Sequence, residues 1–134
     1  MYKESFIDNE IRKLALILAR LIGLKADGKA DEFVKLADST LLNEYSIDWD
    51  ELPGMPLDDF EVLLQNNNYT ADKLDTLAQL LYLRVEPFDA SDKTLACLQK
   101  VLLIFNILEK KYHAQSLGNI NKRNFINQYL HNNS

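Results

Sequence analysis

The side chains with the greatest potential for chemistry are two histidines and one cysteine. His113 and His131 are the only histidines, and no second histidine stands at the i, i+4 spacing that helical zinc motifs use. Because His113 closes a predicted helix, we expect its ring to meet the last carbonyl groups of that helix rather than a metal. Cys97 occupies a predicted inward position beside leucines, which favours a small buried hydrophobic side chain over a catalytic thiolate. These residues predict neither a catalytic site nor a metal site.

Acidic side chains gather at the start of a short helix predicted over 57–66. Asp58, Asp59 and Glu61 could hold a hard cation such as Ca2+ or Mg2+. Carboxylates in the first turn also interact favourably with the helix dipole without any metal, and we favour that interpretation. The four glycines are isolated, so the chain has neither a P-loop nor a dinucleotide-binding fingerprint. The sequence therefore predicts no bound cofactor.

The composition is typical of a globular domain. With 134 residues, of which 47% are apolar and 26% charged, the chain can bury a core without metals or disulfides. A formal net charge of −5 disfavours nucleic acid, whose phosphates such a surface repels. A single cysteine precludes an internal disulfide, and we see no secretory signal and no apolar run of about 20 residues, the length that spans a bilayer. We expect a cytoplasmic protein without nucleic-acid or membrane partners.

Hydrophobic periodicity predicts an all-α fold in a single domain over residues 1–134. No stretch alternates convincingly with period two, whereas apolar residues recur at helical spacing. About five to six helices in antiparallel hairpins are expected, arranged either as a tetratricopeptide-like right-handed stack or as an irregular bundle. The expected parts are a helical hairpin over 3–44, an irregular segment over 45–56, helices within 57–113, and a C-terminal helix over 121–131.

Local signals place the ends of these helices. Gly28 is expected to adopt the left-handed conformation that ends the first helix, and Gly118 is expected to separate the last two helices. Thr70 is the expected N-cap of a helix over 71–85. Asp89 or Ser91 is expected to cap the long helix that follows, over 91–113.

The stretch Ile11–Leu24 dominates the first helix. After Lys13 it holds one charge, Arg20, and one glycine, Gly23, among leucine, isoleucine and alanine. Apolar residues lie on more than one side, which predicts burial around most of the circumference, by other helices or by a second copy of the chain. The possible partner surface comprises Leu16, Ile17, Arg20 and Leu24 on this helix, together with Lys122 and Arg123 on the C-terminal helix.

Two resemblances follow from the first hairpin. The junction Gly28-Lys29-Ala30-Asp31-Glu32-Phe33, followed by Leu36, Ala37 and Leu41, resembles that of a tetratricopeptide repeat, although Phe33 stands where the repeat usually has alanine. Asp8, Ile11 and Leu14, followed by Leu18-Ala19-Arg20-Leu21-Ile22-Gly23-Leu24-Lys25, resemble a family of small bacterial helical proteins of unknown function. That second resemblance covers residues 8–45. It implies an all-helical, repeat-like fold, and it implies no activity, ligand or catalytic residue.

Three functions are compatible with these patterns. The favoured one is a non-enzymatic scaffold that binds a protein or peptide, including itself as a homodimer. An alternative is an enzyme or small-ligand binder with a pocket between the hairpins, lined by Tyr82, Arg84, Trp49 or His113. The other alternative is a regulatory protein that acts through the C-terminal helix and its cations.

Overall fold

The fold is all-α, as predicted. The computed structural model describes the backbone of residues 2–132 and the side chains of residues 8–132, and no strand occurs within that range. Across the described residues, no helix has the length and apolar content that crossing a lipid bilayer requires. The elements are α1 (Tyr2–Ala26), α2 (Ala30–Tyr45), the short 3-10 helix η1 (Leu52–Gly54), α3 (Leu57–Asn67), α4 (Ala71–Val85), α5 (Asp92–Lys111) and α6 (Leu117–Asn132).

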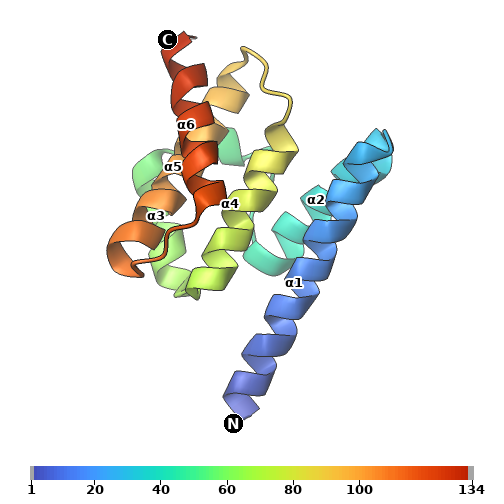
Figure 1. Cartoon of the computed structure of the whole chain (residues 1–134), viewed down its shortest axis with the longest axis vertical. Coiled ribbons are helices and arrows are strands. Elements are labelled where there is room, and N and C mark those ends of the chain that lie inside the picture. Colours follow the sequence, from blue (N-terminus) through green and yellow to red (C-terminus); the bar gives the residue numbers. More distant parts are fainter. Residues whose placement is uncertain (1, 133–134) are drawn as a thin grey trace.

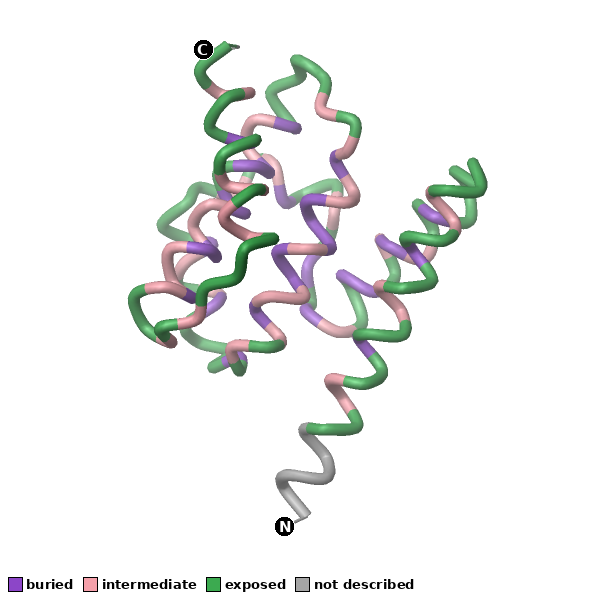
Figure 2. Tube along the Cα trace, in the orientation of Figure 1, coloured by how far each residue is buried: buried purple, intermediate pink, exposed green. Residues whose placement is uncertain are grey.

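Helices α4 and α5 form the central pair of the structure. They pack against each other along their lengths; α1 and α2 pack on α4, whereas η1, α3 and α6 pack on α5 (Figure 1). The buried side chains accordingly concentrate on α4, on α5 and on the inward faces of their neighbours (Figure 2). Leucine is the most frequent residue of the core, and Tyr45, Phe60 and Phe105 are its largest fully buried aromatic side chains.

Short-range signals explain where several helices begin and end. The Thr70 hydroxyl accepts a hydrogen bond from the Lys73 amide, and the Ser91 hydroxyl accepts one from the Thr94 amide, so both predicted N-caps are confirmed. Gly28 has a φ of +72°, the left-handed conformation that only glycine adopts without a steric penalty. That residue turns the chain from α1 into α2.

The predicted boundary at Gly118 was wrong. Helix α6 begins at Leu117 and runs through this glycine, four residues earlier than expected. The Ser116 hydroxyl accepts a hydrogen bond from the Asn119 amide at 3.0 Å, which satisfies a free amide in the first turn. The break lies instead at 112–116, where His113 has a φ of +52° and is exposed. Helix α5 therefore ends at Lys111 rather than at 113.

The chain's own helices do not bury the first helix around most of its circumference, so that alternative was wrong, whereas burial by a second copy of the chain stays a prediction. Only α2 and α4 contact α1 among the described elements, so one face is covered and the opposite face is not. Leu14 and Leu21 are fully buried, whereas Leu16 is 72% exposed. Apolar composition alone does not reveal how many neighbours a helix has.

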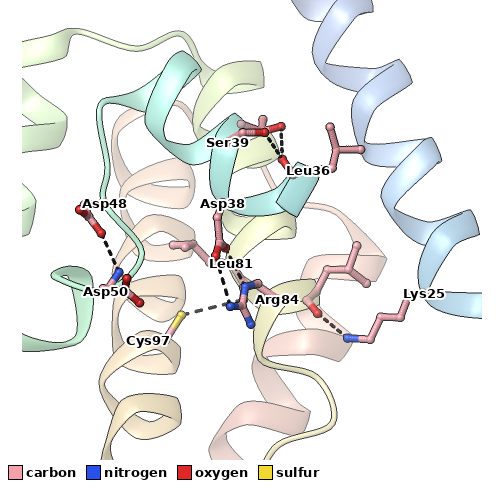
Figure 3. A network of polar contacts seen from close by, with 11 residues as sticks. Lys25, Leu36, Asp38, Ser39, Asp48, Asp50, Leu81, Arg84 and Cys97 are labelled. Atoms are coloured by element: carbon pink, nitrogen blue, oxygen red, sulfur yellow. Dashed lines mark hydrogen bonds and ion pairs between the residues drawn. The ribbon is translucent and has the colours of Figure 1, made fainter. Parts of the chain in front are cut away.

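Polar side chains tie the first hairpin to α4 (Figure 3). The Arg84 side chain on α4 forms an ion pair with Asp38 on α2, with Nε 2.9 Å from Oδ1, and its guanidinium stacks 4.5 Å from the ring of Trp49. The Lys25 amine at the end of α1 donates hydrogen bonds to the carbonyl oxygens of Leu83 and Glu86. Those carbonyls lie at the C-terminal end of α4, where no helical amide remains to bond them. Burial lowers the pKa of Lys25.

Lys100 is the unexpected member of the core. It lies on α5 with only 2% of its surface exposed, and its amine lies 6.0 Å from the centre of the Phe60 ring. No carboxylate among the described residues pairs with this amine, and burial lowers its pKa. The long aliphatic stem fills the core while the amine rests against an aromatic face.

A chain of tyrosines joins α2, α4 and the end of α5. The Tyr45 hydroxyl donates to the Lys73 carbonyl at 2.9 Å, the Tyr69 hydroxyl donates to the Tyr45 carbonyl, and the Tyr112 hydroxyl donates to the Tyr69 carbonyl. Burial, reinforced by the neighbouring Tyr69, raises the pKa of Tyr45. Burial also raises the pKa of the Cys97 thiol to about 12.

This burial predicts a loss of stability at alkaline pH. Above about pH 9–10 the unfolded chain releases the Cys97 and Tyr45 protons while the native chain retains them, so the free energy of unfolding falls as pH rises, by up to ~1.4 kcal/mol per pH unit for each group. We expect Tyr45→Phe to lose about 1 kcal/mol at pH 8, because one hydrogen bond is lost, and to show a shallower decline above pH 10. Urea denaturation at several pH values measures both effects. The native chain and the variant differ only at residue 45, so an unchanged decline in the variant would contradict the assignment to Tyr45.

Candidate interaction surface on helix α1

One face of α1 belongs to the core. Leu14 and Leu21, two turns apart, are fully buried against α2 and α4, and Ile17 and Leu24 are half-buried against the same cluster. Two of the predicted partner-surface residues, Ile17 and Leu24, thus contribute mainly to the contact with the chain's own helices. Because the helix has 3.6 residues per turn, residues such as Leu16, Ala19 and Gly23 lie on the opposite side and point outward.

The opposite face of α1 is exposed (Figure 2), and its exposed residues include Ala15, Leu16, Ala19, Ile22 and Gly23. Leu16 is 72% exposed and Ile22 is 53% exposed. The line of residues opposite Leu14 and Leu21 is named here the outer seam, and it consists of Arg12, Leu16, Ala19, Gly23 and Ala26. These residues recur at intervals of four and three, and all five are exposed. Small residues in this pattern leave room for another helix to approach closely, because interaxial distance depends on the side chains at the contact.

Gly23 is unusual for its position in the middle of a 25-residue helix. A β-carbon built there meets no other atom within 4 Å, so no packing within the described chain requires glycine. Glycine in a helix interior costs about 1 kcal/mol relative to alanine. Gly23 thus lowers the stability of α1, and no contact within the described chain explains why glycine stands there.

A groove of about 540 Å3 adjoins this face between α1 and α2. Its lining residues are Arg20, Leu24, Glu32, Lys35, Leu36 and Ser39. Leu24 and Leu36 form its apolar floor, and the charged groups stand at its rim. Arg20 therefore lies where the exposed face of α1 meets a hollow that could receive a partner's side chain.

The charges along this face are mostly unpaired. Lys13 forms an ion pair with Glu44 at 2.6 Å, and the hydrogen bond to that carboxylate raises the pKa of Lys13. By contrast, Arg12, Arg20 and Asp27 pair with no other described residue. Exposed charges without internal partners are available to another molecule at little cost in desolvation.

Lys122 and Arg123 lie away from this surface, on α6, and both are engaged internally. The Arg123 guanidinium donates to the Asn106 side chain at 2.8 Å and forms an ion pair with Glu109 at 2.9 Å. The Lys122 amine lies 5.4 Å from the centre of the Tyr82 ring. These cations attach α6 to α5 and α4, and the structure does not bring them together with Leu16 and Arg20.

The groups proposed to line a pocket between the hairpins do not converge. Arg84 and Trp49 stack on each other, whereas Tyr82 packs against Phe88 beside α6 and His113 is exposed beyond the end of α5. Within the described residues, no three histidine, cysteine or acidic side chains group as metal ligands would. Cys97 is fully buried, with its thiol 3.9 Å from the Leu81 carbonyl.

A second hollow, of about 420 Å3, lies between α3 and the C-terminal half of α5. Leu64, Leu103 and Ile107 supply an apolar floor, and Lys110 and Lys111 stand at its rim. Three of its polar groups are already engaged, since the Tyr69 and Tyr112 hydroxyls bond to backbone carbonyls and the Asn106 side chain accepts from Arg123. The hollow therefore offers few converging polar groups to orient a small ligand.

Reasoning from the sequence identified Leu16 and Arg20 but missed Ala19, Gly23 and Ile22. The signal for the missed residues was present in the spacing of residues 12, 16, 19, 23 and 26, which follows a four-three alternation on the side away from Leu14. Small residues are easily taken as background when large apolar residues are counted. Comparisons with known proteins add nothing to this surface, because the chain matches no protein-family profile, no curated protein sequence and no solved structure.

Proposed function

We propose that this chain is a non-enzymatic interaction protein that docks a partner protein on the outer face of α1. The observation that carries the proposal is the 72% exposure of Leu16 on a helix whose other face is fully buried. Ile22 and the groove beside Arg20 flank this face on its two sides. Large apolar side chains left exposed favour contact with another molecule, since water leaves such surface at a net gain.

The arrangement of the chemically capable residues supports a binding role rather than an enzymatic one. Cys97 is sealed in the core with a raised pKa, which disfavours the thiolate that a nucleophile requires. Arg84 is held by Asp38 and Trp49.

The test replaces exposed apolar residues in two places and compares what the chain captures from its native cells. We expect the double variant Leu16→Ser, Ile22→Ser to lose a partner protein that the native chain captures by crosslinking. A second copy of the chain, carrying a different tag, counts as a partner in this comparison. Leu117→Ser is the matched control, because Leu117 is 74% exposed on α6, far along the chain from this face. Equal capture by all three proteins would contradict a docking role for α1.

A further inference from the structure

The outer seam of α1 has the pattern of a helix–helix contact. Leu16, Ala19 and Gly23 lie at intervals of three and four, the spacing that keeps a line of side chains facing one neighbouring helix. The residues from 12 to 26 extend the seam over about 20 Å of helix. No other described helix covers this line, which lies along the edge of the molecule (Figure 1).

The nature of the seam indicates a close approach. A β-carbon at Gly23 would stand in open space, so this glycine serves no internal contact although it weakens its own helix. A second helix crossing here at short range would account for it, because a missing side chain lets two backbones approach. Leu16, which is 72% exposed, then provides the large side chain that a small-residue surface on the other helix would accommodate.

We propose that the partner on this seam is a second copy of the chain, with the two α1 helices antiparallel. This inference rests on the proposed docking role of α1 and identifies its occupant. Charge distribution gives the direction: the unpaired Arg12 is the first residue of the seam, and the unpaired Asp27 follows its last residue. An antiparallel arrangement centred near Ala19 brings Arg12 of each copy beside Asp27 of the other, whereas a parallel one places Arg12 beside Arg12 and Asp27 beside Asp27.

The acidic end is reinforced by the turn that follows α1. Asp31 and Glu32 occupy the exposed first turn of α2, at the same end of the molecule as Asp27, and Lys29 offsets one of these three charges. Two antiparallel helices also align their dipoles favourably. A two-fold axis near Ala19 then repeats every contact twice, as in most protein dimers, because one surface supplies both sides of the interface.

Two variants distinguish a loss of dimerisation from a loss of folding. Gly23→Leu adds bulk where the monomer has open space, so we expect the monomer to be as stable as the native chain or more stable. The same bulk would force the two helices apart, and we expect a dissociation constant raised about 10-fold or more in sedimentation equilibrium. Leu117→Ser on α6 is the control and should leave the dissociation constant unchanged. A native chain that stays monomeric at high concentration would overturn the proposal.

Cysteine crosslinking determines the orientation. The native Cys97 is fully buried and remains silent, so single cysteines can be introduced without removing it. Ala19→Cys, at the middle of the seam, should form a disulfide with the same introduced cysteine of the second copy. In an antiparallel dimer of Arg12→Cys chains the two introduced cysteines lie about 20 Å apart, too far for a disulfide. A mixture of Arg12→Cys and Ala26→Cys chains should crosslink, because the two positions then face each other.

The remaining outcomes are equally decisive. Self-crosslinking of Arg12→Cys without crosslinking in the mixture would show a parallel dimer and overturn the proposed orientation. If the native chain is monomeric but the Leu16→Ser and Ile22→Ser chain loses a captured protein, then this inference fails while the docking role of α1 stands. If the chain is monomeric and both changes leave capture intact, both proposals fail.

Discussion

Replacing Phe60 by alanine is expected to destabilise the protein by about 3–5 kcal/mol, the range observed when a buried phenylalanine is truncated. The ring is fully buried on α3 and packs toward α5, where the Lys100 amine lies 6.0 Å from its centre. Truncation removes apolar contacts and leaves a cavity that α3 can only partly close. Urea denaturation followed by far-UV circular dichroism measures the change in unfolding free energy.

The control for Phe60 lies two residues along the same helix. Val62 is 51% exposed, so Val62→Ala should change stability by no more than about 0.5 kcal/mol. Phe60→Ala should also admit water to Lys100 and return its lowered pKa toward the ordinary lysine value, which NMR titration of the folded variant would detect. Equal losses from the two substitutions would contradict the assignment of Phe60 to the core.

The second large effect is expected at Leu21. This side chain is fully buried between α1 and its neighbours, and Leu21→Ala should cost about 2–5 kcal/mol in unfolding free energy. Leu16 provides a control of the same residue type on the same helix, exposed at 72%. Leu16→Ala should cost less than about 0.5 kcal/mol when measured on dilute protein. Denaturation curves in which Leu16→Ala is as destabilising as Leu21→Ala would mean that the outer face is covered within the monomer.

Much of the fold could be predicted because the deciding signals are local. Thr70 and Ser91 cap helices by bonding amides only three residues away, and Gly28 supplies a backbone conformation that its own lack of a side chain permits. The helices themselves follow from periodic apolar residues. None of these signals depends on what another part of the chain does.

The predictions that failed depended on competition or on distant contacts. Gly118 was taken as a helix break, but Ser116 bonds the Asn119 amide and starts the helix before the glycine. The burial of Lys100 was not predicted, because its charged group suggests exposure although its long stem can occupy a core position. Neither outcome is visible in periodicity.

The candidate surface was only partly predictable for the same reason. Leu16 could be identified because it lies off the Leu14 and Leu21 stripe, whereas Lys122 and Arg123 appeared equally available in the sequence. Their commitment to α5 and Tyr82 depends on where α6 packs. The meaning of Gly23 likewise required the structure, because only the structure shows that no neighbouring atom in the described chain would clash with a side chain there.

The attachment of the first hairpin to the rest of the chain has a consequence for how the protein opens. Helices α1 and α2 contact the remaining helices through α4, and the polar links include Lys25, Arg84 and the ion pair of Lys73 with Glu10. Such a unit can separate while α4 and α5 stay paired, so its amide hydrogens would exchange through a partial opening and those of α5 through global unfolding. The same detachment would expose the stripe of Leu14 and Leu21 beside the outer seam, so the hairpin is where domain swapping between copies would begin.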